Sequence, residues 1–205
     1  MKKMCLAIIL MFIVCGGSQD SSKVIPKPEE NLPQINKSVL MVIAPQNFRD
    51  EEYKEPFDLF TKSGIKVTTA SIDTLPAKGM LGMVIKPDLT LEQITPDSFD
   101  ALVIVGGSGC QVLWDNKTLH GIVASFNKTG KTVAAICIAP VVLARVGILK
   151  DIKATAFSTV KDEIVKCGGQ YTGNGVEVVG NIVTGSGPQA AKDFADAILE
   201  RLKEQ

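Results

Sequence analysis

The sequence predicts an α/β fold, a three-layer sandwich in which a mostly parallel sheet lies between two layers of helices. Short, continuously apolar runs alternate with amphipathic segments along the chain. Strands of a parallel sheet are covered on both faces and therefore have this continuous apolar character, and the connections between them are helical. A length of 205 residues with 45% hydrophobic residues is sufficient for one such domain with a sizeable core.

The charges give no reason to expect nucleic acid as a partner. The chain has 22 acidic and 22 basic residues, and its formal net charge is zero. Proteins that bind nucleic acid concentrate basic residues in a patch or stripe. The lysines here are scattered instead, so we expect them to lie on an ordinary solvated surface.

Residues 1–15 have the features of an export signal. Lysines precede a short apolar core that ends at Val14, and this core is too short to span a bilayer comfortably. Cys15 follows directly, as in bacterial lipoprotein signals with a lipidated cysteine, although Val14 stands where those signals have a small residue. The alternatives are an uncleaved membrane anchor and an ordinary cleaved signal. We expect an exported, membrane-anchored lipoprotein with a polar tether at 16–36 and a folded domain at 37–205.

Within this domain, apolar runs of strand length alternate with helical patterns that begin and end at turn residues. In chain order we expect a strand at 38–44, a helix at 50–63, strands at 65–70 and 100–105, a helix at 117–127, a strand at 131–136, a helix at 140–146, strands at 152–156, 176–179 and 182–184, and a helix at 188–202. The stretch 73–97 is rich in turn residues and predicts a small hairpin followed by a loop.

Cys137 lies at the corner between an apolar strand and a helix with a proline in its first turn. Strand, sharp turn and helix form a nucleophile elbow, which exposes the side chain at the corner. The amides at the start of the helix would lower the pKa of the thiol and bind an oxyanion. The alternative is a buried cysteine with a purely structural role.

Three turns should meet at one edge of the sheet, because the carboxyl ends of parallel strands lie together. They carry Glu51 and Glu52 after the first strand, Gly107 and Cys110 after the third, and Cys137 after the next. A carboxyl group, an amide-rich turn and a thiol therefore converge. The spacing leaves the choice between the two glutamates open. The glycine turn lacks the spacing of a dinucleotide or P-loop motif.

Four motifs, in their order along the chain, resemble those of the ThiJ/PfpI superfamily. They are Pro56 with Asp58 ahead of Ser63-Gly64-Ile65-Lys66-Val67, the turn Val105-Gly106-Gly107, the elbow Ala134-Ala135-Ile136-Cys137 with Pro140, and Thr184-Gly185-Ser186-Gly187-Pro188. The similarity runs from about residue 37 to the C-terminus.

The resemblance implies a flavodoxin-like sheet, a homodimer, and chemistry without a cofactor or metal. Members pair an oxidisable cysteine with a glutamate that is often protonated, and counting back from Pro56 assigns this role to Glu52. The N–H groups of Gly107 and Ile138 would hold the oxyanion. Members include cysteine peptidases or amidases, chaperones, oxidative-stress proteins, and glyoxalases or deglycases that act on methylglyoxal adducts.

The chain departs from this family pattern in its histidines. In the peptidase branch a histidine directly follows the nucleophile, and here Ile138 takes that position. The deglycase-type branch has a histidine downstream of the elbow, where this chain has Phe157. His120 is the only histidine in the chain, and its helix is expected to begin at the active edge. It is a candidate accessory group, with an ordinary surface histidine as the alternative. Peptidase activity is therefore disfavoured.

Two functions remain open. In the first, Cys137 adds to a small reactive aldehyde as a hemithioacetal and Glu52 transfers the proton. In the second, the domain senses oxidants or binds a partner without catalysis, and Glu52 stabilises an oxidised Cys137 sulfinate. Cys110 is a candidate resolving thiol that would form a disulfide with Cys137 in an oxidising compartment, the alternative being an inert thiol.

Overall fold

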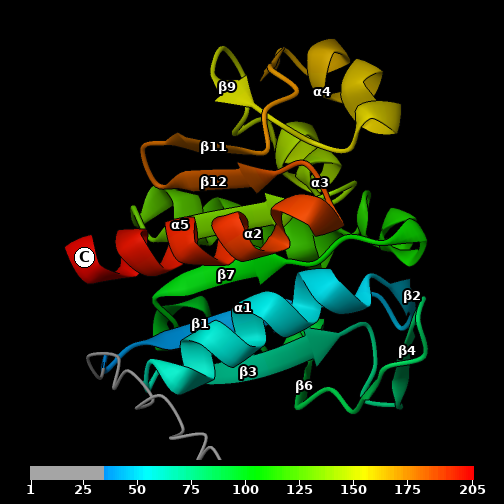
Figure 1. Ribbon diagram of the computed structural model, residues 1–205, viewed down its shortest axis with the longest axis vertical. Coiled ribbons are helices and arrows are strands. Elements are labelled where there is room, and N and C mark those ends of the chain that lie inside the picture. Colours follow the sequence, from blue (N-terminus) through cyan, green and yellow to red (C-terminus); the bar gives the residue numbers. More distant parts are fainter. Residues whose placement is uncertain (1–34) are drawn as a thin grey trace, which may run out of the picture. The chain divides into compact units, whose positions relative to one another are not determined.

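The computed structural model describes residues 35–205, and its strands and helices alternate as the sequence predicts (Figure 1). The main sheet has seven strands in the order β11-β12-β8-β7-β1-β3-β6. Its strands are β1 (Ser38–Val42), β3 (Lys66–Ser71), β6 (Leu89–Thr90), β7 (Ala101–Ile104), β8 (Thr132–Ile136), β11 (Val176–Val179) and β12 (Ile182–Gly185). All neighbours pair in parallel except β11 and β12, which form an antiparallel hairpin. The mostly parallel, flavodoxin-like sheet is therefore confirmed.

The three central strands, β1, β7 and β8, owe their position to their composition. Every residue of β7 and β8 is buried, as is β1 from Val39 onward. Burying a Val, Leu or Ile side chain stabilises a fold by about 1.5–3 kcal/mol. These strands therefore form the core of the molecule and place their carboxyl ends side by side.

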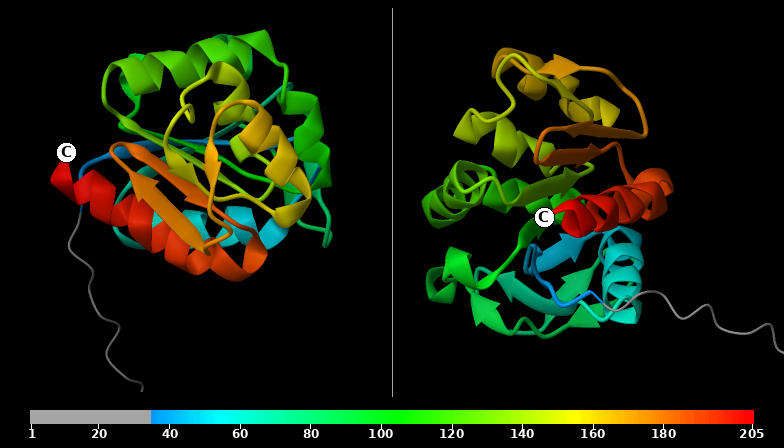
Figure 2. Two further views of the ribbon diagram at one scale, coloured as in Figure 1. Left: turned by 90° about the horizontal axis from the view of Figure 1, so that it is seen from above. Right: turned by 90° about the vertical axis from the view of Figure 1, so that its left-hand side faces the viewer.

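Helices cover both faces of the main sheet, as the three-layer prediction requires (Figure 2). On one face lie α1 (Asp50–Lys62) and α5 (Ala191–Glu204), and on the other lie α2 (Lys117–Lys128) and α3 (Pro140–Val146). The α5 helix buries Phe194, Ile198 and Leu202, which helical spacing places on one side. The short α4 (Lys161–Lys166) packs against α3 and against a small sheet outside the main one.

Smaller elements complete the described chain. They are the three-stranded sheet of β2 (Gln46–Phe48), β4 (Ala77–Gly79) and β5 (Val84–Ile85), the pair β9 (Lys153–Ala154) and β10 (Gln170–Tyr171), and the 3-10 helices η1 (Leu91–Gln93), η2 (Pro96–Ser98), η3 (Ser108–Leu113), η4 (Ser158–Val160) and η5 (Pro188–Ala190). The β4–β5 hairpin lies within the stretch for which a hairpin was predicted. The β2 strand was not predicted, and the expected final helix begins as η5.

The prediction of a strand at 152–156 is wrong beyond its first residues. Only β9 pairs, and it pairs with β10 outside the main sheet. The Thr155 N–H donates to the Thr184 hydroxyl at 2.9 Å. The backbone N–H of Thr155 therefore finds its acceptor in a side chain and not in a neighbouring strand.

The export signal, Cys15 and nearly all of the predicted tether lie outside the described residues. Between residues 35 and 205, no helix is long and apolar enough to cross a membrane.

Candidate active site

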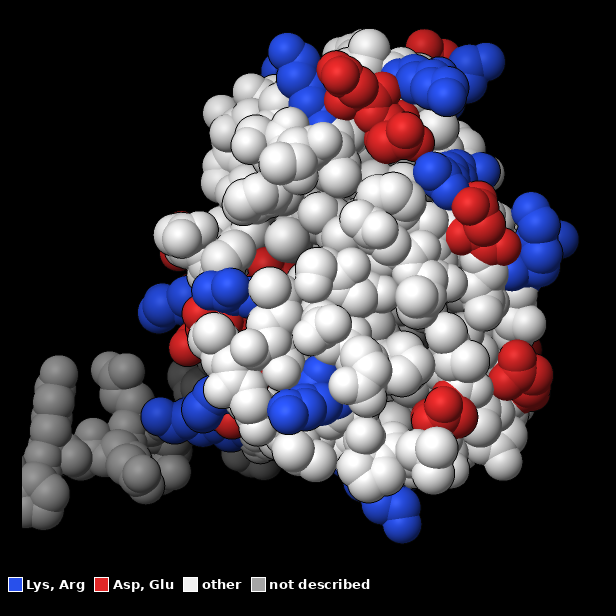
Figure 3. Space-filling view, turned by 90° about the vertical axis from the view of Figure 1, so that its right-hand side faces the viewer, with Lys and Arg blue, Asp and Glu red and all other residues white. Residues whose placement is uncertain are grey.

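The carboxyl ends of β1, β7 and β8 surround a cavity of 410 Å³, so the predicted convergence of three turns is observed. The residues that line it are Arg49, Glu52, Met80, Gly107, Ser108, Gln111, Cys137, Ile138, Phe157, Thr159, Pro188 and Gln189. Figure 3 views the molecule from this edge, where charged side chains lie mostly around the rim and the centre is largely uncharged. Arg49 and Glu52 are the only Lys, Arg, Asp or Glu residues among those lining residues.

Cys137 has the backbone of a nucleophile elbow. Its φ angle is +65°, which is rare for a residue other than glycine and costs about 1–3 kcal/mol. Its N–H donates to the Gly185 carbonyl at 2.9 Å, and its own carbonyl accepts from the Phe157 N–H at 2.8 Å. These two bonds tie Cys137, which follows β8, to Gly185 at the end of β12 and to Phe157. The side chain is 8% exposed and faces the cavity.

Glu52, not Glu51, is the glutamate beside the thiol. It lies in the first turn of α1 and is completely buried. Its Oε2 accepts the Gly106 N–H at 3.1 Å, and its carboxyl group interacts with the Cys137 thiol. Within residues 35–205, Oε1 has no hydrogen-bond partner. Glu51 instead pairs with Arg49 at 2.8 Å.

Gly106 permits this contact, although the sequence pattern marked it only as part of a turn. A Cβ atom on Gly106 would lie 2.5 Å from the Cys137 Cβ and 2.6 Å from Glu52 Oε2. Real Cβ atoms do not approach other atoms so closely. Glycine at this position is therefore a condition for the Cys137–Glu52 pair. The consecutive glycines after an apolar strand were the available signal.

Two backbone N–H groups, from Gly107 and Ile138, donate toward the Cys137 sulfur. Gly107 has a φ angle of +96°. A Cβ there would lie 2.4 Å from the Arg49 nitrogen, so only glycine brings this amide into position. The pair of N–H groups is suited to stabilising a negative oxygen that forms on a substrate next to the sulfur.

The Gly107 and Ile138 amides lower the pKa of the Cys137 thiol, as predicted, but the expected net lowering of this pKa is wrong. Burial raises the pKa of Cys137 to about 12, and the negative charge of Glu52 adds to this effect, whereas the two amides oppose it and are outweighed. Burial also raises the pKa of Glu52 to about 7, against the hydrogen bonds from Cys137 and Gly106. Above about pH 7 the pair therefore holds one proton between a carboxyl oxygen and a sulfur.

His120 does not reach the thiol, so its candidate role as an accessory group is wrong. Its Nε2 lies 2.7 Å from the Trp114 carbonyl oxygen, and it does not line the cavity. The Trp114 indole N–H donates to the Ile138 carbonyl at 3.1 Å. His120 therefore contacts the tryptophan that in turn contacts the elbow.

Cys110 is completely buried and does not line the cavity. Burial raises the pKa of this thiol. Cys110, Cys137 and Cys167 are all free thiols. A neutral, buried Cys110 is a poor nucleophile, so the structure gives the resolving role no support.

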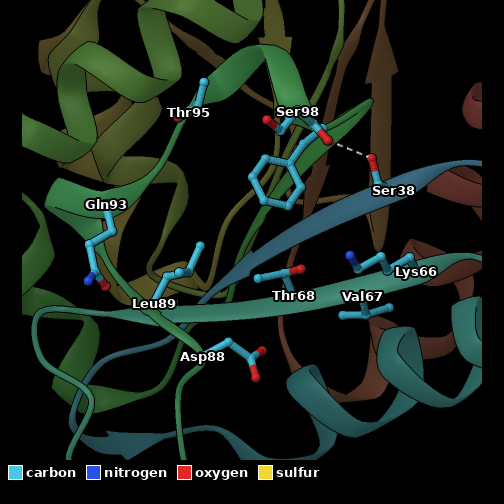
Figure 4. Close-up of a pocket in the computed structure, with 10 residues that line it drawn as sticks. Ser38, Lys66, Val67, Thr68, Asp88, Leu89, Gln93, Thr95 and Ser98 are labelled. Atoms are coloured by element: carbon cyan, nitrogen blue, oxygen red, sulfur yellow. Dashed lines mark hydrogen bonds between the residues drawn. The ribbon is translucent and has the colours of Figure 1, made fainter.

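A second cavity, of 480 Å³, lies away from the elbow between β3, β6 and the segment before β7 (Figure 4). Ser38, Asp88 and Thr95 are among its lining residues. The Asp88 carboxylate accepts the Thr69 N–H at 2.8 Å, and the Ser38 hydroxyl donates to the Ser98 carbonyl at 2.9 Å. It contains no thiol and no histidine. We also find no cluster of metal-ligating side chains in the described part of the chain.

The profile of the DJ-1/PfpI family matches residues 37–201, which include the elbow, both glycines and Glu52. The chain belongs to the DJ-1/PfpI family. This result confirms the resemblance to ThiJ/PfpI proteins that the sequence motifs indicated.

Relatives within the DJ-1/PfpI family cover most of the chain. An uncharacterised protein of Methanocaldococcus jannaschii is 39% identical over 99% of this chain and 98% of its own length. The glutathione-independent glyoxalase DJR-1.2 of Caenorhabditis elegans is 31% identical over 82% of this chain and 89% of its own. The deglycase PfpI of Pyrococcus furiosus is 31% identical over 73% of this chain and 90% of its own length.

A solved structure agrees in fold. The ThiJ/PfpI domain protein of Brachyspira murdochii superposes with a TM-score of 0.81 at 35% identity, over 83% of this chain and 99% of that protein. The three-layer DJ-1/PfpI fold therefore has an experimental counterpart at substantial sequence identity.

Proposed function

We propose that this DJ-1/PfpI protein acts on small reactive aldehydes as a glyoxalase or deglycase without a cofactor. The observation that carries the proposal is the buried Cys137–Glu52 pair beneath the N–H groups of Gly107 and Ile138. The family relatives named as a glyoxalase and as deglycases support the same kind of reaction.

Cys137 is the nucleophile in this proposal. Its sulfur forms a bond to the aldehyde carbon, and the aldehyde oxygen becomes the oxyanion of a hemithioacetal. The Gly107 and Ile138 N–H groups stabilise that charge. The proton released from the Cys137–Glu52 pair then neutralises the oxygen.

Glu52 is the proton carrier. With a 2-oxoaldehyde, it removes the proton from the carbon bonded to sulfur and returns a proton to the neighbouring carbonyl carbon, which leaves a thioester of a 2-hydroxy acid. Water hydrolyses the thioester and restores the thiol. The net reaction consumes one aldehyde and one water and forms one 2-hydroxy acid. A carboxyl group with a pKa of about 7 can both accept and donate protons near neutral pH.

The test of this function compares Glu52→Gln and Cys137→Ser with wild type in a methylglyoxal-consumption assay. We expect Cys137→Ser to abolish turnover and Glu52→Gln to reduce kcat by roughly 10²–10⁴-fold, because an amide cannot transfer protons. Glu51→Gln is the matched control, since Glu51 lies on the same turn and pairs with Arg49 instead. Wild-type turnover by Glu52→Gln would exclude Glu52 as the proton carrier.

The second candidate function is oxidant sensing through Cys137. Two features of the site favour it: no histidine lines the cavity, and a partly protonated Glu52 could donate a hydrogen bond to a sulfinate. In this case wild type should not consume methylglyoxal. Mass spectrometry after peroxide treatment should then find sulfinate on Cys137 in wild type and a different extent of oxidation in Glu52→Gln.

A further inference from the structure

Apolar side chains gather around the nucleophile in the cavity. Met80, Ile138, Phe157 and Pro188 all line it. Met80 and Phe157 are 43% and 40% exposed, so large apolar surfaces face solvent next to Cys137. Single exposed apolar residues are common, but several around one reactive group provide a surface for an apolar part of a ligand.

Phe157 is held in this position. Its N–H donates to the carbonyl of Cys137 at 2.8 Å, which ties its backbone to the elbow. Its ring lies against Gly187, where an added Cβ would approach the ring to 3.2 Å. The ring therefore occupies a defined place beside the nucleophile.

Arg49 adds hydrogen-bond donors to the same cavity. Its Nε and Nη2 donate to Glu51 at 2.8 and 2.9 Å. Its Nη1 has no acceptor among residues 35–205, so it can donate to an oxygen of a bound ligand. The cavity thus combines an aromatic face with a cationic donor, and both lie next to the thiol.

Building on the proposed function, we propose that this cavity selects 2-oxoaldehydes with an aromatic or large apolar substituent over methylglyoxal. Cavities of about 300–1,000 Å³ take drug-sized ligands, and methylglyoxal would leave most of this 410 Å³ cavity to water. An aryl group would contact the Phe157 ring in an offset or edge-to-face arrangement. The ketone oxygen would accept a hydrogen bond from Arg49, with the aldehyde carbon at the sulfur.

The turnover test compares phenylglyoxal with methylglyoxal in wild type and Phe157→Ala. We expect kcat/KM for phenylglyoxal to exceed that for methylglyoxal by roughly tenfold in wild type. Phe157→Ala should remove this ratio mainly by raising KM for phenylglyoxal. Val165→Ala, which replaces an exposed valine of α4 outside the cavity, should leave it unchanged. Mandelate formation is measured directly, with Cys137→Ser as a blank, because phenylglyoxal also modifies arginines.

A protection test separates this proposal from the proposed function. Phenylglyoxylate and pyruvate resemble the two aldehydes but lack the reactive aldehyde carbon. In wild type, phenylglyoxylate should protect Cys137 from iodoacetamide at roughly tenfold lower concentration than pyruvate. In Phe157→Ala, the two compounds should protect Cys137 at similar concentrations. If wild type turns over neither aldehyde, the proposed glyoxalase function is wrong. The protection assay still tests the selectivity of the cavity in that case. Equal protection, or a ratio that Phe157→Ala leaves intact, overturns the proposal.

Discussion

At the scale of single residues, the site depends on two side chains that are costly to place together. Glu52 is a completely buried carboxyl group, and Cys137 has a left-handed backbone conformation. Neither feature stabilises the fold, because burial of a carboxylate and a positive φ angle both cost free energy. Their juxtaposition is instead what makes a proton available at a thiol, and the surrounding hydrogen bonds maintain it.

The raised pKa of Glu52 predicts a pH dependence of stability. The folded state binds the proton up to about pH 7, whereas an ordinary glutamate releases it near 4.5. Relative to the ionised carboxylate, the protonated Glu52 favours the folded state. This contribution is complete below pH 4.5 and is lost as the pH rises to about 7, a change of up to about 3 kcal/mol in the free energy of unfolding. Glu52→Gln should remove this component of the slope in urea titrations between pH 4.5 and 8.

The matched variant for this measurement is Glu51→Gln, since Glu51 lies at the surface in a pair with Arg49. It should retain the wild-type slope. Parallel curves for wild type and Glu52→Gln would mean that Glu52 does not bind its proton as described.

At the level of elements, the end of η3 contacts the elbow and is linked to α3 and α4. Trp114 donates to the Ile138 carbonyl, and the Arg145 guanidinium lies 5.1 Å from the indole ring centre. Arg145 also pairs with Asp115 at 2.6 Å and with Glu163 at 3.1 Å. The turn that presents the Ile138 N–H is therefore linked to elements outside the strand and helix that form the elbow.

Trp114→Phe tests this arrangement, because it keeps an aromatic ring beside Arg145 and removes the indole N–H. We expect the free energy of unfolding to fall by about 1 kcal/mol. In the proposed reaction, kcat should fall more than KM changes, since Trp114 acts by positioning the amide and does not line the cavity. Unchanged kcat in a variant that loses stability would limit Trp114 to a structural role.

At the scale of the whole molecule, the active edge also carries exposed apolar side chains outside the cavity. Leu75, Leu81, Val84 and Val112 are 57–70% exposed, and the centre of this edge is largely free of charge (Figure 3). We predict that a second copy of the chain covers them. Val84→Asp should shift sedimentation from dimer to monomer, whereas Val178→Asp, on β11, should not. A monomeric wild type would contradict this prediction.

The N-terminal sequence predicts a lipid anchor at Cys15 in an exported protein. Cys15→Ser should release the protein from the membrane fraction of a bacterial host without changing its thermal unfolding, because the folded domain is expected to begin near residue 37. Labelled palmitate should enter wild type and not the variant. Absence of label in wild type would contradict the lipoprotein prediction.

The alternation of strands and helices, the parallel sheet and the elbow at Cys137 were all predictable from the amino-acid sequence. These features follow from local apolar runs, turn residues and the rule that parallel strands end at one edge. Residue spacing left Glu51 and Glu52 equivalent, and only the family resemblance pointed to Glu52 before the fold placed it beside the thiol.

The electrostatics and the contacts of the site could not be predicted from the sequence, because they depend on how the folded chain packs. The thiol pKa rises because burial and Glu52 outweigh the amides, and no local pattern records burial. The role of Gly106 depends on how closely α1 and the elbow approach, and His120 turns to Trp114 because η3 places that carbonyl 2.7 Å away. Such distances arise from the packing of segments that are far apart in the chain, so they become available only once the chain has folded.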